Sequence, residues 1–234
     1  MSSSTSSNPV SGTTLPPAPE AGGVAGALVH ESVAQHIARV AASLFARQGF
    51  DATSVREIVE AAEVTKPTLY YHFGSKMGLA EALLSRPLET LATTISAIVN
   101  EEPDPLHAVA RLIEAHFRFC CEAPDRARLA YAVMFGPLSS SLAGMLGPYA
   151  ERFDQLLEQA VDRLVASQLI PGDDKSRSGF TTAVRGLVVI QTVDYLYRNH
   201  PLPEDLPTRL VAQLLQGFSI SHEPPPQESG VKHV

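Results

Sequence analysis

The side chains best suited to bind another molecule lie close together between residues 66 and 76. This stretch combines cations, a hydroxyl and rings with polar tips: Lys66, Thr68, Tyr70, Tyr71, His72 and Lys76. Lysine and tyrosine suit phosphate oxygens, and threonine can touch a phosphate or a thymine methyl group. The composition of the stretch therefore favours contact with a nucleic acid.

Two short helices are expected to position these groups. Ser54 followed three residues later by Glu57 forms a capping box at the start of an apolar helical pattern. Thr65 can cap a second helix, on which Leu69 and Phe73 share one face and leave the polar side chains on the others. Two helices joined by a turn of three or four residues are the helix-turn-helix arrangement that enters the major groove of DNA.

A set of residues before, within and after these helices follows a known pattern: Ile37, Ala41, Leu44, Phe45, Gly49, Phe50, Thr53–Ile58, Ala61, Ala62, Thr68–Phe73, Ser75, Lys76 and Leu79. In this stretch, about a fifth of the chain, the sequence resembles the tetracycline-repressor (TetR) family of transcriptional regulators. One departure is Glu63, at a turn position where that family usually has glycine. A glutamate in left-handed backbone costs about 1–2 kcal/mol, so we expect an altered turn or a modest loss of stability.

The resemblance implies a set of DNA-contacting residues: Ser54, Arg56, Lys66, Thr68, Tyr70, Tyr71, His72 and Lys76. Arg56 could form a bidentate contact with guanine, while Ser54 and Lys76 would contact phosphates. Alternatively, Tyr70 or Tyr71 packs against the first helix. Arg56 could also pair with Glu60, but such a surface pair contributes only about 0.3–0.5 kcal/mol, too little to keep it from a guanine.

The charge of the chain does not follow the basic pattern of many nucleic-acid-binding proteins. The net charge is −7; residues 28–86 hold six Lys/Arg and six Asp/Glu, and residues 87–234 hold twelve and eighteen. Positive charge at a DNA-binding face must then come from Arg56, Lys66, Lys76 and helix N-termini. We expect a slope of log affinity against log salt much shallower than about −10.

The remainder of the chain predicts a helical body. After a first helix near 29–48, proline and glycine breakers delimit helices near 75–99 (with a kink or break at Pro87), 104–122, 124–136, 144–168, 176–199 and 204–219. The helix near 176–199 is apolar on two sides, so one side can face its own domain and the other a partner. With the helix near 204–219 it would form the four-helix homodimer interface that the resemblance implies; the alternative is a helix buried within one monomer.

The resemblance also implies a pocket for a small-molecule effector in the body. Aromatic and scattered polar side chains are the candidates for its lining: His107, Arg111, His116, Phe117, Tyr131, Met134, Phe135, Phe153, Gln191, Asp194 and Tyr195. Each is also a candidate for an ordinary core position, because aromatic and methionine stripes at helical spacing are more often core.

Other kinds of site find little support in the sequence. His116, Cys120 and Cys121 could begin a metal site, but no further cysteine and no second ligand cluster accompany them, so we expect no metal and no cofactor. The motifs of common hydrolases, nucleotide-binding enzymes and zinc proteases are absent, which argues against an enzyme. Without a membrane-length apolar run or a signal-peptide pattern, we expect no membrane partner and a cytoplasmic location.

Taken together, the patterns predict an all-α protein with four segments. A three-helix helix-turn-helix DNA-binding domain at 28–74 and a helical effector-binding and dimerisation domain at 75–221 lie between disordered tails at 1–27 and 222–234. The expected function is a ligand-responsive repressor that binds a palindromic double-stranded DNA operator as a homodimer. The alternatives are a transcriptional activator, a ligand-independent DNA binder, or a protein-binding adaptor whose head no longer holds DNA.

Overall fold

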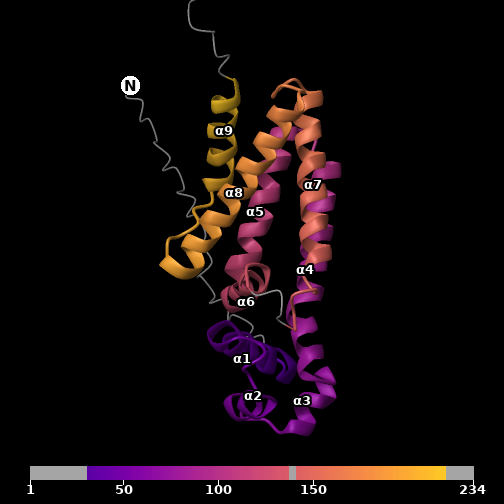
Figure 1. Cartoon of the computed structure of the whole chain (residues 1–234), viewed down its shortest axis with the longest axis vertical. Coiled ribbons are helices and arrows are strands. Elements are labelled where there is room, and N and C mark those ends of the chain that lie inside the picture. The colour runs from indigo at the N-terminus through magenta and orange to yellow at the C-terminus, as the bar shows by residue number, and fades with distance from the viewer. Residues whose placement is uncertain (1–30, 137–140, 220–234) are drawn as a thin grey trace, which may run out of the picture. The chain divides into compact units, whose positions relative to one another are not determined.

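A computed structural model describes residues 31–136 and 141–219, and every regular element in these ranges is an α-helix (Figure 1). The first three helices are α1 (Val33–Gln48), α2 (Val55–Ala61) and α3 (Lys66–Phe73). The body consists of α4 (Lys76–Glu101), α5 (Pro105–Glu122), α6 (Pro124–Met134), α7 (Gly147–Ala166), α8 (Asp174–Arg198) and α9 (Leu206–Ser219). The predicted all-α class is confirmed. The tails expected at 1–27 and 222–234 lie outside the described residues.

Local capping fixes where the first helices begin and end. α1 begins a few residues later than predicted, because Ser32 and Gln35 form a capping box. The predicted box of Ser54 and Glu57 starts α2, and the Thr65 hydroxyl accepts the Thr68 backbone N–H at the start of α3. These caps satisfy backbone N–H groups that would otherwise have no partner in the helix.

The turn between α2 and α3 has the left-handed residue that the sequence comparison suggested. Glu63 has φ 52, and the N–H of Val64 reaches back to the carbonyl of Val59 at 3.0 Å. This is the usual hydrogen-bond pattern of a helix end that favours glycine at the left-handed position. Because Glu63 is exposed, its side chain meets no steric obstacle, and the turn forms at a backbone cost of about 1–2 kcal/mol.

The fourth helix was expected to kink or break at Pro87, and the break is wrong, because α4 is one helix from Lys76 to Glu101; the kink stays a prediction. Its two halves are anchored in different hydrophobic clusters. Leu83 and Leu84 pack in the cluster of the N-terminal helices, whereas Ile95 packs in the body. Burial on both sides outweighs the cost of about 3 kcal/mol that a proline imposes inside a helix.

The N-terminal helices do not bury their apolar faces alone. Their hydrophobic cluster, called here the head cluster, is built around Ile37, Phe45, Ile58, Leu69, Leu79 and Leu84, and it also includes Leu129, Ala130, Leu142 and Leu146. The last four residues belong to α6 and to the segment before α7. In addition, the Ser141 hydroxyl donates a 2.6 Å hydrogen bond to Asp51. The head cluster therefore extends into α6 and the segment before α7, and the predicted domain boundary at residue 74 stays a prediction.

One apolar stripe of α8 is buried within its own chain, and part of the other lines a cavity. Phe180, Val184 and Val188 are buried in the body cluster with residues of α4, α5, α7 and α9. Thr182 and Gly186 line an internal cavity. Thr182 and Gly186 are exposed, so the expectation that this second stripe faces a partner stays a prediction. In the described part of the chain no helix is both long and apolar enough to cross a membrane.

Candidate nucleic-acid interface and internal cavity

Helix α3 presents most of its predicted contact residues to solvent. Only Leu69 is fully buried, whereas 85% of Tyr71 and 46% of Tyr70 is exposed. Lys66 and His72 are exposed as well, and the His72 ring packs edge-on against the Tyr71 ring at a centroid distance of 5.1 Å. The Tyr71 ring is therefore not buried against the first helix. We define the α3 surface as Lys66, Tyr70, Tyr71 and His72.

Two further predicted residues belong to the caps that hold the helices. The Ser54 hydroxyl accepts the Glu57 N–H at 3.2 Å, and the Ser54 N–H donates to the Glu57 carboxylate at 2.7 Å. The Thr68 hydroxyl is 2.8 Å from that of Thr65, so it belongs to the N-terminal turn of α3. These polar groups fix the start of both helices, and Ser54 remains exposed.

Arg56 stands on α2 with its guanidinium in solvent and one acidic neighbour. Its Nε donates to Glu60 at 2.6 Å, and the two side chains are 76% and 59% exposed. An exposed pair of this kind is screened by water and contributes little to stability. Arg56 can therefore leave Glu60 for a phosphate or a guanine at little cost.

Lys76 makes contacts that the sequence pattern did not predict. Its ammonium donates to the carbonyls of Phe50 and Thr53 at 3.0 and 2.9 Å and lies 4.3 Å from the centre of the Phe50 ring. Two of its three donors are thus directed at the loop between α1 and α2. Lys76 braces the head from within, which leaves Lys66 as the cation of the α3 surface.

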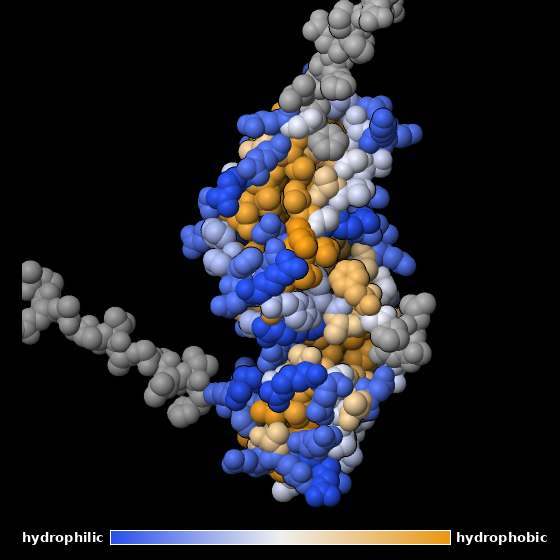
Figure 2. All heavy atoms as spheres, turned by 60° about the vertical axis from the view of Figure 1, so that its left-hand side comes forward, coloured by the Kyte–Doolittle hydropathy of each residue, from blue (hydrophilic) through white to orange (hydrophobic). Residues whose placement is uncertain are grey.

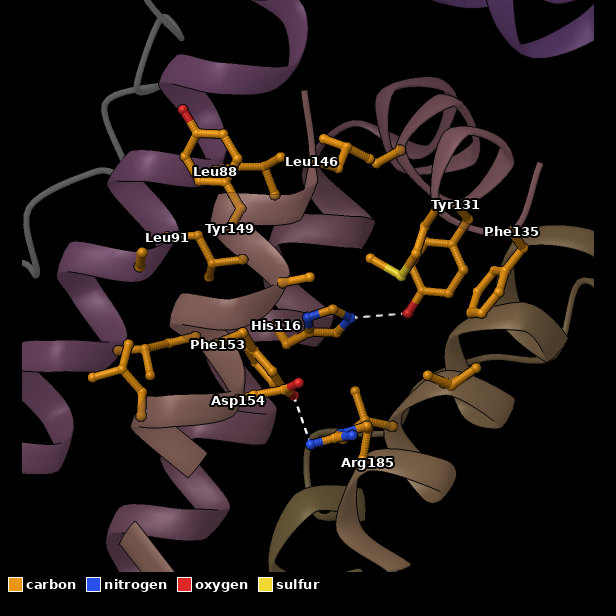
Figure 3. A pocket seen from close by; sticks show the side chains of 18 of the residues that line it. Leu88, Leu91, His116, Tyr131, Phe135, Leu146, Tyr149, Phe153, Asp154 and Arg185 are labelled. Carbon is orange, nitrogen blue, oxygen red and sulfur yellow. Dashed lines mark hydrogen bonds and ion pairs between the residues drawn. The ribbon is translucent and has the colours of Figure 1, made fainter. Parts of the chain in front are cut away.

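An internal cavity of about 470 Å³ lies in the body between α4, α5, α6, α7 and α8 (Figure 3). Its volume falls within the range of small-molecule sites. Five of the predicted effector residues line it: His116, Tyr131, Met134, Phe135 and Phe153. Met134 and Phe135 are 47% and 63% exposed, so large apolar side chains reach solvent on the α6 side of the cavity.

His116 and Tyr131 form a hydrogen-bonded pair on the cavity wall. Nε2 of His116 lies 3.1 Å from the Tyr131 hydroxyl. The centre of the His116 ring lies 5.7 Å from the centre of the Phe153 ring. Nδ1 of His116 is buried and has no hydrogen-bond partner among the described residues. Burial lowers the pKa of His116 to about 4 and raises the pKa of Tyr131. Both side chains are therefore uncharged at neutral pH.

The formal charges on the cavity wall compensate each other. Arg185 of α8 donates to Asp154 of α7 at 2.8 Å, and the two side chains are 46% and 39% exposed. Figure 3 shows this pair below His116 and Phe153. The cavity lining therefore carries no net charge at neutral pH.

The other predicted effector residues lie elsewhere. His107 and Arg111 both contact the carboxylate of Glu102, at 3.1 and 3.2 Å, because the three groups meet where α4 ends and α5 begins. Phe117 is buried in the body cluster. Asp194 pairs with Arg198 one turn further along α8, Tyr195 packs against the cluster around Phe119, and Gln191 is not part of the cavity lining. These six positions are therefore not brought together at the cavity.

Sequence reasoning missed most of the aliphatic and charged lining: Leu88, Leu91, Ala92, Ile95, Leu146, Tyr149, Asp154, Arg185, Gly186 and Val189. Gly186 carried a signal, because a glycine inside a long helix lowers helix stability and often has a packing or functional reason. A Cβ built at Gly186 would meet no heavy atom within 4 Å.

The positions of His116, Cys120 and Cys121 give little support to a metal site. Cys120 Sγ lies 3.8 Å from Nε2 of His116, but Cys121 is exposed. Burial also raises the pKa of Cys120 to about 12, so its thiol is not ready to act as a thiolate ligand. Within residues 31–136 and 141–219, no three His, Cys, Asp or Glu side chains are grouped closely enough to hold an ion.

Sequence comparison finds proteins that are similar to the N-terminal helices, and structure comparison finds proteins with a similar fold. Residues 37–83 match the sequence model of the bacterial regulatory proteins of the tetR family. The HTH-type transcriptional repressor KstR2 of Mycobacterium tuberculosis is 36% identical over 78 residues, which cover 33% of this chain and 39% of that repressor. The HTH-type transcriptional regulator AcrR of Shigella flexneri is 28% identical over 150 residues, 61% of this chain and 69% of AcrR.

Solved structures extend the likeness beyond the head. The structure of KstR2 from Mycobacterium tuberculosis aligns with a TM-score of 0.66 at 19% identity, over 80% of this chain and 96% of that one. PfmR from Thermus thermophilus, a TetR family transcriptional regulator, aligns with a TM-score of 0.63 at 23% identity, over 79% and 99%. The N-terminal helices thus match the tetR family of bacterial regulatory proteins, and the fold of the chain is similar to that of solved TetR family regulators.

Proposed function

We propose that this protein is a ligand-responsive transcriptional repressor that binds a palindromic operator as a homodimer. The observation that carries this proposal is the α3 surface. Its lysine, tyrosines and histidine project from a helix that is capped at its start and held in the head by the buried Leu69. Such a helix can enter a major groove without any rearrangement of the head. Because operator DNA lies in the cytoplasm of bacteria, we place this activity there.

An exposed apolar face of α8 and the apolar surface around it support a homodimer. Ile190 and Tyr197, seven residues apart on one face, are 44% and 57% exposed although both are large and apolar. Figure 2 shows apolar surface gathered over the upper part of the body, on the side of the molecule where Figure 1 places α8 and α9. A second copy related by a two-fold axis would cover this face and present two α3 helices to successive major grooves.

A bound effector would act on the head through shared side chains. Leu146 and Ala130 line the cavity and are also buried in the head cluster. Leu88 of α4 lines the cavity and packs against the same cluster. A ligand that changes the position of α6 or α4 therefore changes the support of α1. Repression is relieved when the ligand favours the form whose heads do not fit the operator, and a hundredfold difference in affinity corresponds to about 2.7 kcal/mol.

Selection of bound fragments from a random DNA pool tests the DNA-binding part. We expect a shared palindromic sequence, and a gel shift with that sequence should lose at least tenfold in affinity with Tyr71→Ala and with Lys66→Ala. Arg118→Ala, which removes an exposed cation from the body, serves as the control and should bind as the unaltered protein does. A pool without a shared sequence would favour the adaptor alternative instead.

An activator is the second candidate, because one similar protein has that role. The HTH-type transcriptional activator FasR of Mycolicibacterium smegmatis is 33% identical over 79 residues, 34% of this chain and 36% of FasR. A reporter driven by the selected operator distinguishes the two: its expression should rise when the gene for this protein is deleted, and a fall would identify an activator.

A further inference from the structure

The chemistry of the cavity wall narrows the kind of molecule that can occupy it. We propose that the cavity binds an uncharged, mainly apolar ligand with a hydroxyl group held at His116, and not an organic anion such as a fatty acid. This inference rests on the proposed role of the cavity as the effector site. It is carried by three features of the wall: the charge pairing, the unpartnered nitrogen of His116, and the open space at Gly186.

The charge pairing disfavours an ionised ligand. Among the described residues that line the wall, the only formal charges are Asp154 and Arg185, which are paired at 2.8 Å. A carboxylate brought into the cavity would find no unpaired cation among the residues that line it, and the loss of its hydration would not be offset. An ammonium group would lack a free carboxylate for the same reason. A neutral molecule meets neither cost.

His116 supplies the polar anchor. The side chain is enclosed between Tyr131 and Phe153, as Figure 3 shows, and one of its two ring nitrogens already faces the Tyr131 hydroxyl. The other, Nδ1, is buried without a hydrogen-bond partner in the described structure. Because Nδ1 is fully buried, a ligand hydroxyl reaches it only when the His116 ring turns towards the cavity. A buried polar nitrogen without a partner is unfavourable, so a ligand that then supplies one gains affinity. A hydroxyl suits either tautomer, because it can donate or accept.

The open space at Gly186 gives the site a test that does not disturb the wall. A side chain at this position would enter space that no heavy atom occupies within 4 Å of the Cβ. Gly186 lines the cavity, so Gly186→Leu places a side chain at the cavity from α8, and leucine also has a higher helix propensity than glycine. Ala150→Leu fills it from α7. Gln159→Leu adds the same apolar side chain to an exposed position of α7 outside the cavity and is the matched control.

Binding is measured on the full chain without DNA. The chain contains no tryptophan, so the neutral dye N-phenyl-1-naphthylamine can be followed without protein indole emission. At pH 7.4 we expect 1-decanol to displace the dye with at least tenfold higher affinity than decanoate, which has the same chain length but carries a charge. No dye signal, no displacement by 1-decanol, or equal or tighter binding of decanoate would overturn the proposal.

The variants locate the binding and test the anchor. Gly186→Leu and Ala150→Leu should each lower the affinity for 1-decanol at least tenfold, and Gln159→Leu should leave it unchanged; any other order would place the ligand elsewhere. His116→Phe should lower the affinity for 1-decanol about fivefold, as expected for one hydrogen bond, and that for the dye less than twofold. Equal losses would overturn the role of His116. Because no DNA is present, this assay and the operator selection can fail independently.

Discussion

The ammonium group of Lys76 lies 4.3 Å from the centre of the Phe50 ring and donates hydrogen bonds to the carbonyls of Phe50 and Thr53. A cation at the start of α4 thus closes the loop that joins α1 to α2. The same loop is held by Thr53, whose hydroxyl donates to the Gly49 carbonyl at 2.7 Å. The orientation of the helix-turn-helix relative to α4 depends on this cluster.

Removal of this cation should weaken the head. We expect Lys76→Met to lower the free energy of unfolding by about 1–3 kcal/mol, because hydrogen bonds from a charged donor to two carbonyls are lost. Urea unfolding followed by circular dichroism measures the change. Lys66→Met, on the exposed α3 surface, should leave stability within about 0.5 kcal/mol. If both variants unfold like the unaltered protein, Lys76 has no bracing role.

The salt dependence of operator binding should report the few cations of the α3 surface. Lys66→Ala should reduce the slope of log affinity against log salt by about one per head, and so by about two for a dimer. Gel shifts at several salt concentrations measure the slope. A slope that is unchanged by the substitution would show that Lys66 does not contact a phosphate.

The turn between α2 and α3 should gain stability from glycine. Glu63→Gly relieves left-handed strain of about 1–2 kcal/mol but adds freedom to the unfolded chain, for a net gain of about 0.5–1 kcal/mol. Thermal unfolding should show Tm raised by roughly 2–3 °C. Glu63→Ala removes the same side chain without easing the backbone, so it should show no rise in Tm; a rise equal to that of glycine would assign the effect to the carboxylate.

Acid should destabilise the body through His116. Its folded-state pKa of about 4 lies below the value of about 6.5 in the unfolded chain. The unfolded state therefore binds the proton more readily, so this contribution to stability is complete above pH 6.5 and is lost as the pH falls towards 4. The loss between pH 7 and pH 5 should be about 2 kcal/mol.

Urea unfolding at the two pH values measures this loss, and two histidine variants assign it. His116→Gln should remove most of the difference between pH 7 and pH 5. His107→Gln, which changes a histidine on the exposed end of α5, should retain it. An unchanged pH dependence in His116→Gln would mean that other groups cause the loss.

Leu142 and Leu146 provide a matched pair for the link between cavity and head. Both are buried in the head cluster, but only Leu146 also lines the cavity. Replacement of either by alanine should lower stability by about 2–5 kcal/mol. Only Leu146→Ala should also change the affinity for the dye in the displacement assay. An equal change in the Leu142 variant would mean that the effect passes through general loosening of the fold.

The fold was largely predictable because its local signals are strong. The capping box at Ser54, together with the glycine and proline breakers, predicted the ends of the helices to within a few residues. The continuity of α4 through Pro87 was not predictable, since it depends on packing of both halves in clusters formed by residues distant in sequence. The left-handed conformation at Glu63 was predictable only through the family pattern.

The cavity was predictable only in part, for a different physical reason. His116, Tyr131 and Phe153 stood out by residue type, but the apolar lining has the same spacing as ordinary core. Whether Leu91 or Gly186 faces a void depends on how five helices pack, which periodicity along one helix does not encode. Asp154 and Arg185 look like two unrelated surface charges in the sequence, because their pairing joins α7 to α8.

Ala130 and Leu146 belong both to the cavity wall and to the head cluster, so under the proposed function the same side chains would contact the ligand and support the head. A bulkier residue at either place would then push on the head as an inducer does, with no inducer present. Selection for a new inducer and selection for a permanently released or permanently bound operator would act on the same codons, and ligand specificity and the resting state of the proposed regulator would evolve together.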